Sequence, residues 1–261
     1  MKKALFFLFL AFAVLTPSSL AQETAPQQKQ SREHRGFYNS SSFGFGFVQS
    51  DWKSCDYSDG DYGKEEKDIE KNEFVGYTYP VFEFKFGVAL ANVVAFHTVL
   101  NFGFYSGTND YFYDEYFKKY KYDDDKYVEI LDKDGNRIYT SDWTRDYSEH
   151  EEESDVAVSA RAYIGFGTTI YPFTNPNSVM NGAFIGGSIG YTFTGTFSKS
   201  SDDFAYGSLG TGFEVELGKD WWVNDHLSIG VGLTYGHSFL HFLETEGSDN
   251  VITLSFRLTR G

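Results

Sequence analysis

The chain has 261 residues, a formal net charge of −15 and a single cysteine, Cys55. One cysteine excludes an internal disulfide, and the acidic balance without a basic patch argues against nucleic acid as a partner. Aromatic residues make up 19% of the chain and glycine contributes 26 residues, a composition that favours many pleated strands.

The chain begins with the pattern of a secretory signal peptide. Lys2 and Lys3 precede an apolar run over residues 4–15, which is too short to span a bilayer. Ser19-Leu20-Ala21 has the small residues that precede a cleavage site. We therefore predict a signal peptide over residues 1–21 that is cleaved after Ala21. We expect no lipid anchor, because no cysteine stands at the cut and Cys55 lies far downstream.

Residues 22–35 are polar and contain proline and glutamine, which predicts a disordered lead-in to a barrel domain over residues 36–261. Apolar residues then alternate with small or polar ones in eight segments, the pattern of half-buried strands. These segments are 36–50, 74–88, 93–106, 154–171, 183–197, 205–219, 226–239 and 251–260.

The connections between the predicted strands differ in length and charge. Those after the first and third strands, 51–73 and 107–153, are long and acidic, and we expect them to be loops. Residues 51–73 hold nine acids and four bases, and 106–155 hold 16 acids and seven bases. The connections after the second, fourth and sixth strands are short, including 172–182 and a tight turn at Asn224-Asp225. Short turns at one rim and long loops at the other are typical of outer-membrane barrels.

One segment inside the second long connection has two interpretations. Asp132-Lys133-Asp134-Gly135-Asn136 resembles the start of a calcium loop, but Trp143 stands where that loop needs its last acidic ligand. Residues 128–130 and 137–139 alternate on either side, which favours a hairpin with an Asp-Gly turn that extends the neighbouring strands.

The two faces of each strand differ in residue size. One face is bulky and apolar, as with Phe82, Phe84 and Phe86, and the other carries mostly glycine, serine and threonine with isolated charges. A narrow barrel has room inside only for the small face, so the bulky face must point outward, where lipid tolerates it. We predict an all-β, antiparallel, up-and-down transmembrane β-barrel of about eight strands. A secreted sandwich or lipocalin-like barrel is the alternative.

Several aromatic residues fall where a membrane interface is expected. Trp221, Trp222 and Tyr171 lie beside short turns, and Trp52 and Tyr235 lie towards the long connections. Amphipathic rings favour that interface, so we expect two aromatic belts.

The signal peptide, the strand count, the uneven connections and segments such as GKDWWVNDHLSIGVGLTYG (218–236) resemble the small outer-membrane barrels of the OmpA and OmpX kind. This resemblance covers about residues 36–261. It implies eight antiparallel strands, a plugged interior, a place in the outer membrane and assembly by the barrel-assembly machinery. The resemblance gives little information about a biochemical activity.

Charged residues on the inward face are the candidate site. They can form a polar gate, or an ion-pair network that fills the lumen, and charges inside a membrane barrel need partners. Because both signs are present, we favour a network in which Glu83, Glu214 or Glu216 pairs with Arg161 or Arg257. The predicted lumen network comprises Glu83, Lys85, Arg161, Glu214, Glu216 and Arg257, with His97 on the same face.

Catalytic and metal-binding residues are harder to find. Lipid A deacylases are barrels of this size with a serine and a histidine near the last strands, but His237-Ser238 lacks their His-x-Ser-Asn pattern. His237 and His241 are a weak metal pair. We predict no enzyme, no cofactor and no metal.

The sequence thus predicts an outer-membrane barrel with a structural or surface-interaction role. Its expected partners are membrane lipid and lipopolysaccharide, with an extracellular ligand bound through 51–73 and 107–153. A narrow passive pore and a lipid-modifying enzyme are the alternative functions.

Overall fold

The structure is a computed structural model that describes part of the chain. The described residues are 36–60, 64–91, 93–119, 122–123, 126–127, 130–131, 137–138, 144–175, 177–198, 206–242 and 245–260. The predicted signal peptide and lead-in, residues 1–35, lie outside them. Within these ranges no helix has the length and apolar character needed to cross a membrane.

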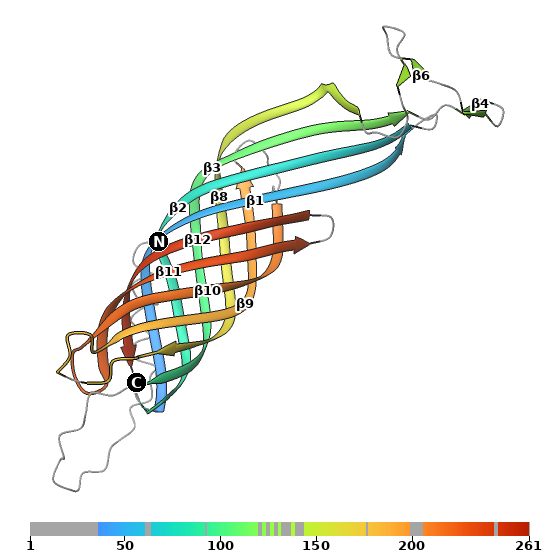
Figure 1. The fold of residues 1–261 in the computed structure, drawn as a ribbon. Helices are drawn as coiled ribbons and strands as arrows, with labels where there is room; N and C mark the ends of the chain where they lie inside the picture. Colours follow the sequence, from blue (N-terminus) through green and yellow to red (C-terminus); the bar gives the residue numbers. More distant parts are fainter. Residues whose placement is uncertain are drawn as a thin grey trace, which may run out of the picture. The chain divides into compact units, whose positions relative to one another are not determined.

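Eight long strands form one closed antiparallel barrel, with ring order β1-β12-β11-β10-β9-β8-β3-β2 (Figure 1). The ring closes because β1 pairs with β12 from Asn39↔Arg260 to Ser54↔Thr245. The all-β, antiparallel, eight-stranded prediction is confirmed. The strands are β1 (Gly36–Gly60), β2 (Lys64–Leu90), β3 (Val94–Lys119), β8 (Thr144–Ile170), β9 (Ala183–Ser198), β10 (Tyr206–Trp222), β11 (Leu227–Phe242) and β12 (Thr245–Arg260).

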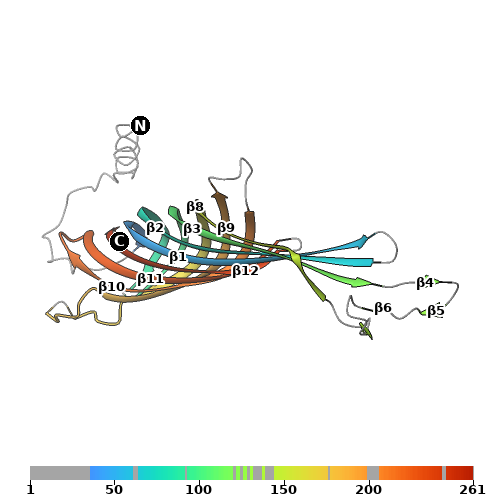
Figure 2. The same ribbon diagram turned by 90° about the horizontal axis from the view of Figure 1, so that it is seen from above.

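Four neighbouring strands are much longer than the other four. β1, β2, β3 and β8 have 25, 27, 26 and 27 residues, whereas β9, β10, β11 and β12 have 16, 17, 16 and 16. Figures 1 and 2 both show β1, β2 and β3 running on past the ends of β11 and β12. We call the parts beyond the closed ring, residues 55–60, 64–69, 108–119 and 144–156, the four-stranded extension.

The extension corrects the prediction that 51–73 and 107–153 are loops. The first is a hairpin whose strands pair from Asp51↔Glu73 to Gly60↔Lys64. In the second, β3 and β8 pair as far as Phe117↔Thr144. High charge suggested loops, but strands already in register inside the barrel can continue pairing, and the Tyr- and Phe-rich composition suits pleated strands.

Between β3 and β8 lie two further pairs of very short strands. β4 (Tyr122–Asp123) pairs with β5 (Lys126–Tyr127), and β6 (Ile130–Leu131) pairs with β7 (Arg137–Ile138). The second pair matches the predicted hairpin, although it forms its own two-stranded sheet and does not extend the barrel strands. Its turn, 132–136, lies outside the described residues.

The connections at the opposite rim are short and hydrogen-bonded. The β10–β11 turn closes through Val223 N–H donating to Leu227 C=O at 2.8 Å, and Asn224 Oδ1 accepts from His226 N–H at 2.9 Å. This is the tight turn that the sequence predicts at Asn224-Asp225.

The faces of the strands divide as predicted. The outward side chains are large and apolar along every strand of the ring, and several are well exposed, with Phe166 75% and Ile189 72% exposed. The inward positions are buried and mostly small or polar. A continuous apolar outer wall would be unstable in water, so lipid is its solvent and the eight strands span a membrane.

One irregularity in β2 changes which residues face inward. The pairing with β3 shifts between Tyr77 and Phe82, and Pro80, which has no N–H to donate, lies in the bulge. Glu83, on the short-turn side of the bulge, and Phe74, on the extension side, are both buried. Strict alternation would place these two residues on opposite faces of the strand. The bulge therefore lets one strand supply both a charge and an aromatic ring to the lumen.

The lumen is crowded around some of its inward glycines. A Cβ at Gly46 would lie 2.6 Å from Val81 Cγ2, and a Cβ at Gly232 would lie 2.7 Å from Glu216 Oε1. This agrees with the small interior of an eight-stranded barrel.

A charge on the outer wall tests its contact with lipid. Ile189→Arg should destabilise the barrel in phosphatidylcholine vesicles by about 2–4 kcal/mol, because arginine is costly at the bilayer centre. Val223→Arg, in an exposed turn, should cost about 0–1 kcal/mol. Urea unfolding followed by tryptophan fluorescence measures both, and equal costs would contradict a lipid-facing wall.

Candidate functional site

The first group of lumen charges lies towards the short turns and centres on Glu216. The Lys85 ammonium binds Glu216, and it also lies 3.1 Å from Glu83 Oε1. On the other side of Glu216, Arg257 Nη1 donates to Glu216 Oε1 at 2.8 Å, and Arg257 Nε lies 3.3 Å from Asp220 Oδ1. These groups come from β2, β10 and β12, so the pairs connect strands across the lumen.

Two tyrosines complete this first group. Arg257 Nη2 donates to the Tyr38 hydroxyl at 3.0 Å, and the Tyr171 hydroxyl donates to Asp220 Oδ2 at 3.1 Å. The guanidinium of Arg257 also lies 3.9 Å from the ring centroid of Phe184. Arg257 therefore has a carboxylate, a hydroxyl or an aromatic face on each side, which offsets the cost of burying its charge.

The second group centres on Arg161 and lies towards the extension. Arg161 Nε donates to Asp249 Oδ2 at 2.8 Å, and Nη1 donates to Glu214 Oε1 at 3.3 Å. Glu214 Oε1 also accepts from Asn101 Nδ2 at 3.2 Å. Ser238 Oγ accepts from Arg161 Nη2 at 3.4 Å.

All six residues of the sequence-predicted network face the lumen and are buried. The structure pairs Arg161 with Glu214 and Arg257 with Glu216, and it brings Glu83 to Lys85 and not to an arginine. His97, on the same face, lies 2.9 Å from Thr169 Oγ1 through Nε2 and stacks on Tyr38.

Sequence reasoning missed two buried carboxylates of the network. Asp220 shares the inward parity of Glu214 and Glu216 along β10, so alternation carried one residue past the predicted strand end would have found it. Asp249 lies in β12 before the predicted start of that strand. With them, the two groups hold the carboxylates Glu83, Glu214, Glu216, Asp220 and Asp249 and the cations Lys85, Arg161 and Arg257.

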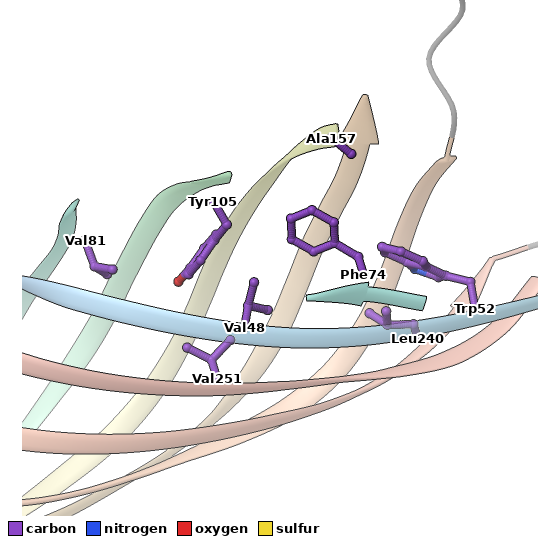
Figure 3. Close-up of a cluster of buried hydrophobic side chains, with 8 residues drawn as sticks. All are labelled: Val48, Trp52, Phe74, Val81, Tyr105, Ala157, Leu240 and Val251. Carbon is purple, nitrogen blue, oxygen red and sulfur yellow. The ribbon is translucent and has the colours of Figure 1, made fainter. Parts of the chain in front are cut away.

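Buried apolar clusters lie on either side of the charges. Figure 3 shows the cluster towards the extension, Val48, Trp52, Phe74, Val81, Tyr105, Ala157, Leu240 and Val251. The cluster towards the short turns comprises Tyr38, Ala89, Ala95, Tyr171 and Phe184. The expectation that Trp52 and Tyr171 belong to interfacial belts is wrong, because both rings point inward and are 2% and 3% exposed.

The space left inside the network is small. One cavity, lined by His97, Lys85 and Glu214 among others, has a volume of about 10 Å³, and a second beside Ser42 and Thr253 also measures about 10 Å³. Each has room for about one water molecule. The described lumen is a packed interior with single-water spaces.

The histidines near the last strands do not form a catalytic arrangement. His237 faces outward, where its Nδ1 lies 2.9 Å from Asn250 Oδ1, whereas Ser238 points inward to Thr192 and Arg161. His237 and His241 are four residues apart on one strand, about 13 Å, which is too far to share a metal ion. Within the described ranges no three His, Cys, Asp or Glu side chains gather closely enough to hold one.

No family model matches the sequence, and a search of curated proteins finds no match. Among solved structures, the chain is similar to the outer membrane protein OprG from Pseudomonas aeruginosa, with 13% identity, a TM-score of 0.40, and coverage of 88% of this chain and 98% of that one. It is also similar to Ail, the attachment invasion locus protein of Yersinia pestis, with 10% identity, a TM-score of 0.34, and coverage of 84% of this chain and 98% of that one. A further similar structure is the outer membrane protease OmpT from Escherichia coli, with 8% identity, a TM-score of 0.34, and coverage of 92% of this chain and 99% of that one.

These likenesses concern the fold alone. By its own closed topology, apolar outer wall and packed lumen, the chain is a small β-barrel of the outer-membrane type.

The lumen network predicts a large difference between two arginines of β12. Arg257→Met should destabilise the folded barrel by about 3–5 kcal/mol, because Glu216 and Asp220 would be left as buried charges without their partner. Arg260→Met, at an exposed position of the same strand, should change stability by less than about 0.5 kcal/mol. Urea unfolding in vesicles measures both, and a tolerated Arg257→Met would show that the network adds little to stability.

Proposed function

We propose that this protein is a structural or surface-interaction protein of the outer membrane, whose closed barrel holds the four-stranded extension outside the bilayer. The observation that supports this most directly is the difference in strand length. Four adjacent strands are about ten residues longer than the other four and stay paired beyond the ring, which a barrel needs only if that part of the sheet has a use outside lipid.

The charge of the extension indicates the chemistry of its partner. Residues 51–73 and 106–155 carry net charges of −5 and −9, most of the chain's −15. Electrostatic complementarity favours a partner with a basic surface, and such binding weakens with salt. Lipopolysaccharide and the barrel-assembly machinery are further proposed partners. Export through a signal peptide cleaved after Ala21 is the proposed route.

A passive pore is the second candidate function, and the packing of the lumen argues against it. Buried ion pairs and the two apolar clusters occupy the cross-section, with spaces of about 10 Å³ between them. Hydrated ions need a continuous wet path, which these groups do not leave.

Planar bilayer recordings test the closed lumen. The full-length protein should give no stepwise currents at ±100 mV, a potential worth about 2.3 kcal/mol per elementary charge. A variant with Trp52→Ala, Phe74→Ala and Leu240→Ala removes the bulk of one apolar cluster and should remain silent, because the ion pairs still block the lumen. Regular steps from the unmodified barrel would favour the pore.

A shortened barrel tests the role of the extension. Joining Ser54 to Glu70 and Gly107 to Ala157 through Asn-Gly turns removes the extension at positions that are already paired. This variant should still show heat-modifiable gel mobility, since the ring is intact.

In lipid nanodiscs, the full-length protein should bind basic members of a panel of extracellular proteins, less so as salt rises, and the shortened variant should not. Acidic members of the panel serve as the control. Identical binding profiles for the two barrels would contradict a surface-interaction role for the extension.

A further inference from the structure

The connection between β8 and β9, residues 172–182, exposes apolar side chains at its tip. Val179 is 85% exposed and Met180 47%, and Phe173 at its start is 42% exposed. A rim loop that faces only water is usually polar, so these side chains need an explanation.

Several backbone groups of this turn are hydrogen-bonded within the turn. Ser178 N–H donates to Asn175 C=O at 3.0 Å, and Asn181 N–H donates to Ser178 C=O at 3.0 Å. Side chains supply further bonds, with Met180 N–H donating to Ser178 Oγ at 3.1 Å and Asn181 Nδ2 donating to Phe173 C=O at 3.2 Å. Each backbone group that is bonded in this way needs no water, which lowers the cost of bringing the turn to a lipid boundary.

Lys219 fixes where the tip lies. It shares the outward parity of Leu217 and Trp221 on β10, which are 55% and 48% exposed on the lipid-facing wall. Its ammonium donates to the Val179 carbonyl and lies 5.6 Å from the centroid of the Trp221 ring. The tip therefore lies beside the outer wall, level with Trp221 along the barrel axis, and does not cover the opening of the lumen.

That height is the membrane interface. Tryptophan rings on barrel walls mark the level of the lipid headgroups, and lysine stems cover apolar surface while the ammonium stays at that level. The exposed apolar side chains of the tip lie beside the lipid-facing wall, because the Val179 carbonyl accepts a hydrogen bond from Lys219 on that wall.

We propose that the turn 172–182 is an interfacial anchor, whose Val179–Met180 tip inserts between the headgroups and acyl chains of the leaflet at the short-turn rim. This rests on the proposed membrane-spanning barrel. The anchor fixes the depth of that rim in the bilayer, and its partner is the lipid surface itself.

Depth-dependent fluorescence quenching tests the anchor. In a Cys55→Ser background, Val179→Cys and Met180→Cys are each labelled with an environment-sensitive fluorophore and folded into phosphatidylcholine vesicles with or without nitroxide-labelled lipid. Ile189→Cys, on the outer wall, is the lipid-exposed reference. Asp225→Cys, in the neighbouring short turn, is the water-exposed reference.

We expect the tip labels to emit further to the blue than the Asp225→Cys label and to be quenched most by nitroxides near the headgroups. Tip labels that behave like Asp225→Cys, while Ile189→Cys is quenched, would overturn the anchor and leave the spanning barrel intact. If Ile189→Cys is also unquenched, the spanning barrel fails and the anchor with it.

Discussion

The closure of the sheet is the constraint on which the rest of this structure depends. In hydrocarbon every backbone N–H and C=O must find a partner within the protein, so the first strand has to pair with the last. β1 and β12 do so from Asn39↔Arg260 to Ser54↔Thr245. Between Ser54 and Gly60, the described part of β1 has passed the end of its pairing with β12 and pairs with β2 alone. An open edge of this kind is tolerable only outside lipid, which makes the end of the ring a marker for the edge of the bilayer.

Closure with eight strands also decides the chemistry inside. The circumference leaves so little width that inward side chains from opposite walls touch. Lys85 on β2 thus reaches Glu216 on β10, and Arg161 on β8 reaches Asp249 on β12. Charges in this space have no bulk water to solvate them, so each is stable only through its partners. The same packing that pairs the charges removes the path an ion would need. Stability and closure of the lumen therefore have one cause.

Alternation along the chain was enough to predict the eight strands and their inward and outward faces, and it placed six charged residues on the inward face. The partners were harder, because they depend on distances across the barrel that no local pattern contains. Asp249 lies beyond the predicted start of its strand, and the bulge at Pro80 reverses the parity that would have placed Phe74 outside. Trp52 illustrates a second limit, since its position near a rim fits either a lipid belt or an inward cap, and only the register decides.

The extension shows why charge is a poor guide to loop structure in this chain. Residues such as Asp56 and Asp68 are paired across β1 and β2, although like charges directly opposite each other weaken a sheet. Such pairs persist because the strands are already aligned by the ring below, so each further pair costs little additional ordering. A sheet held in this way fixes the backbone positions that carry acidic residues, whereas a loop would let those positions vary. Acidic residues at fixed backbone positions suit the partner with a basic surface that we propose for the extension.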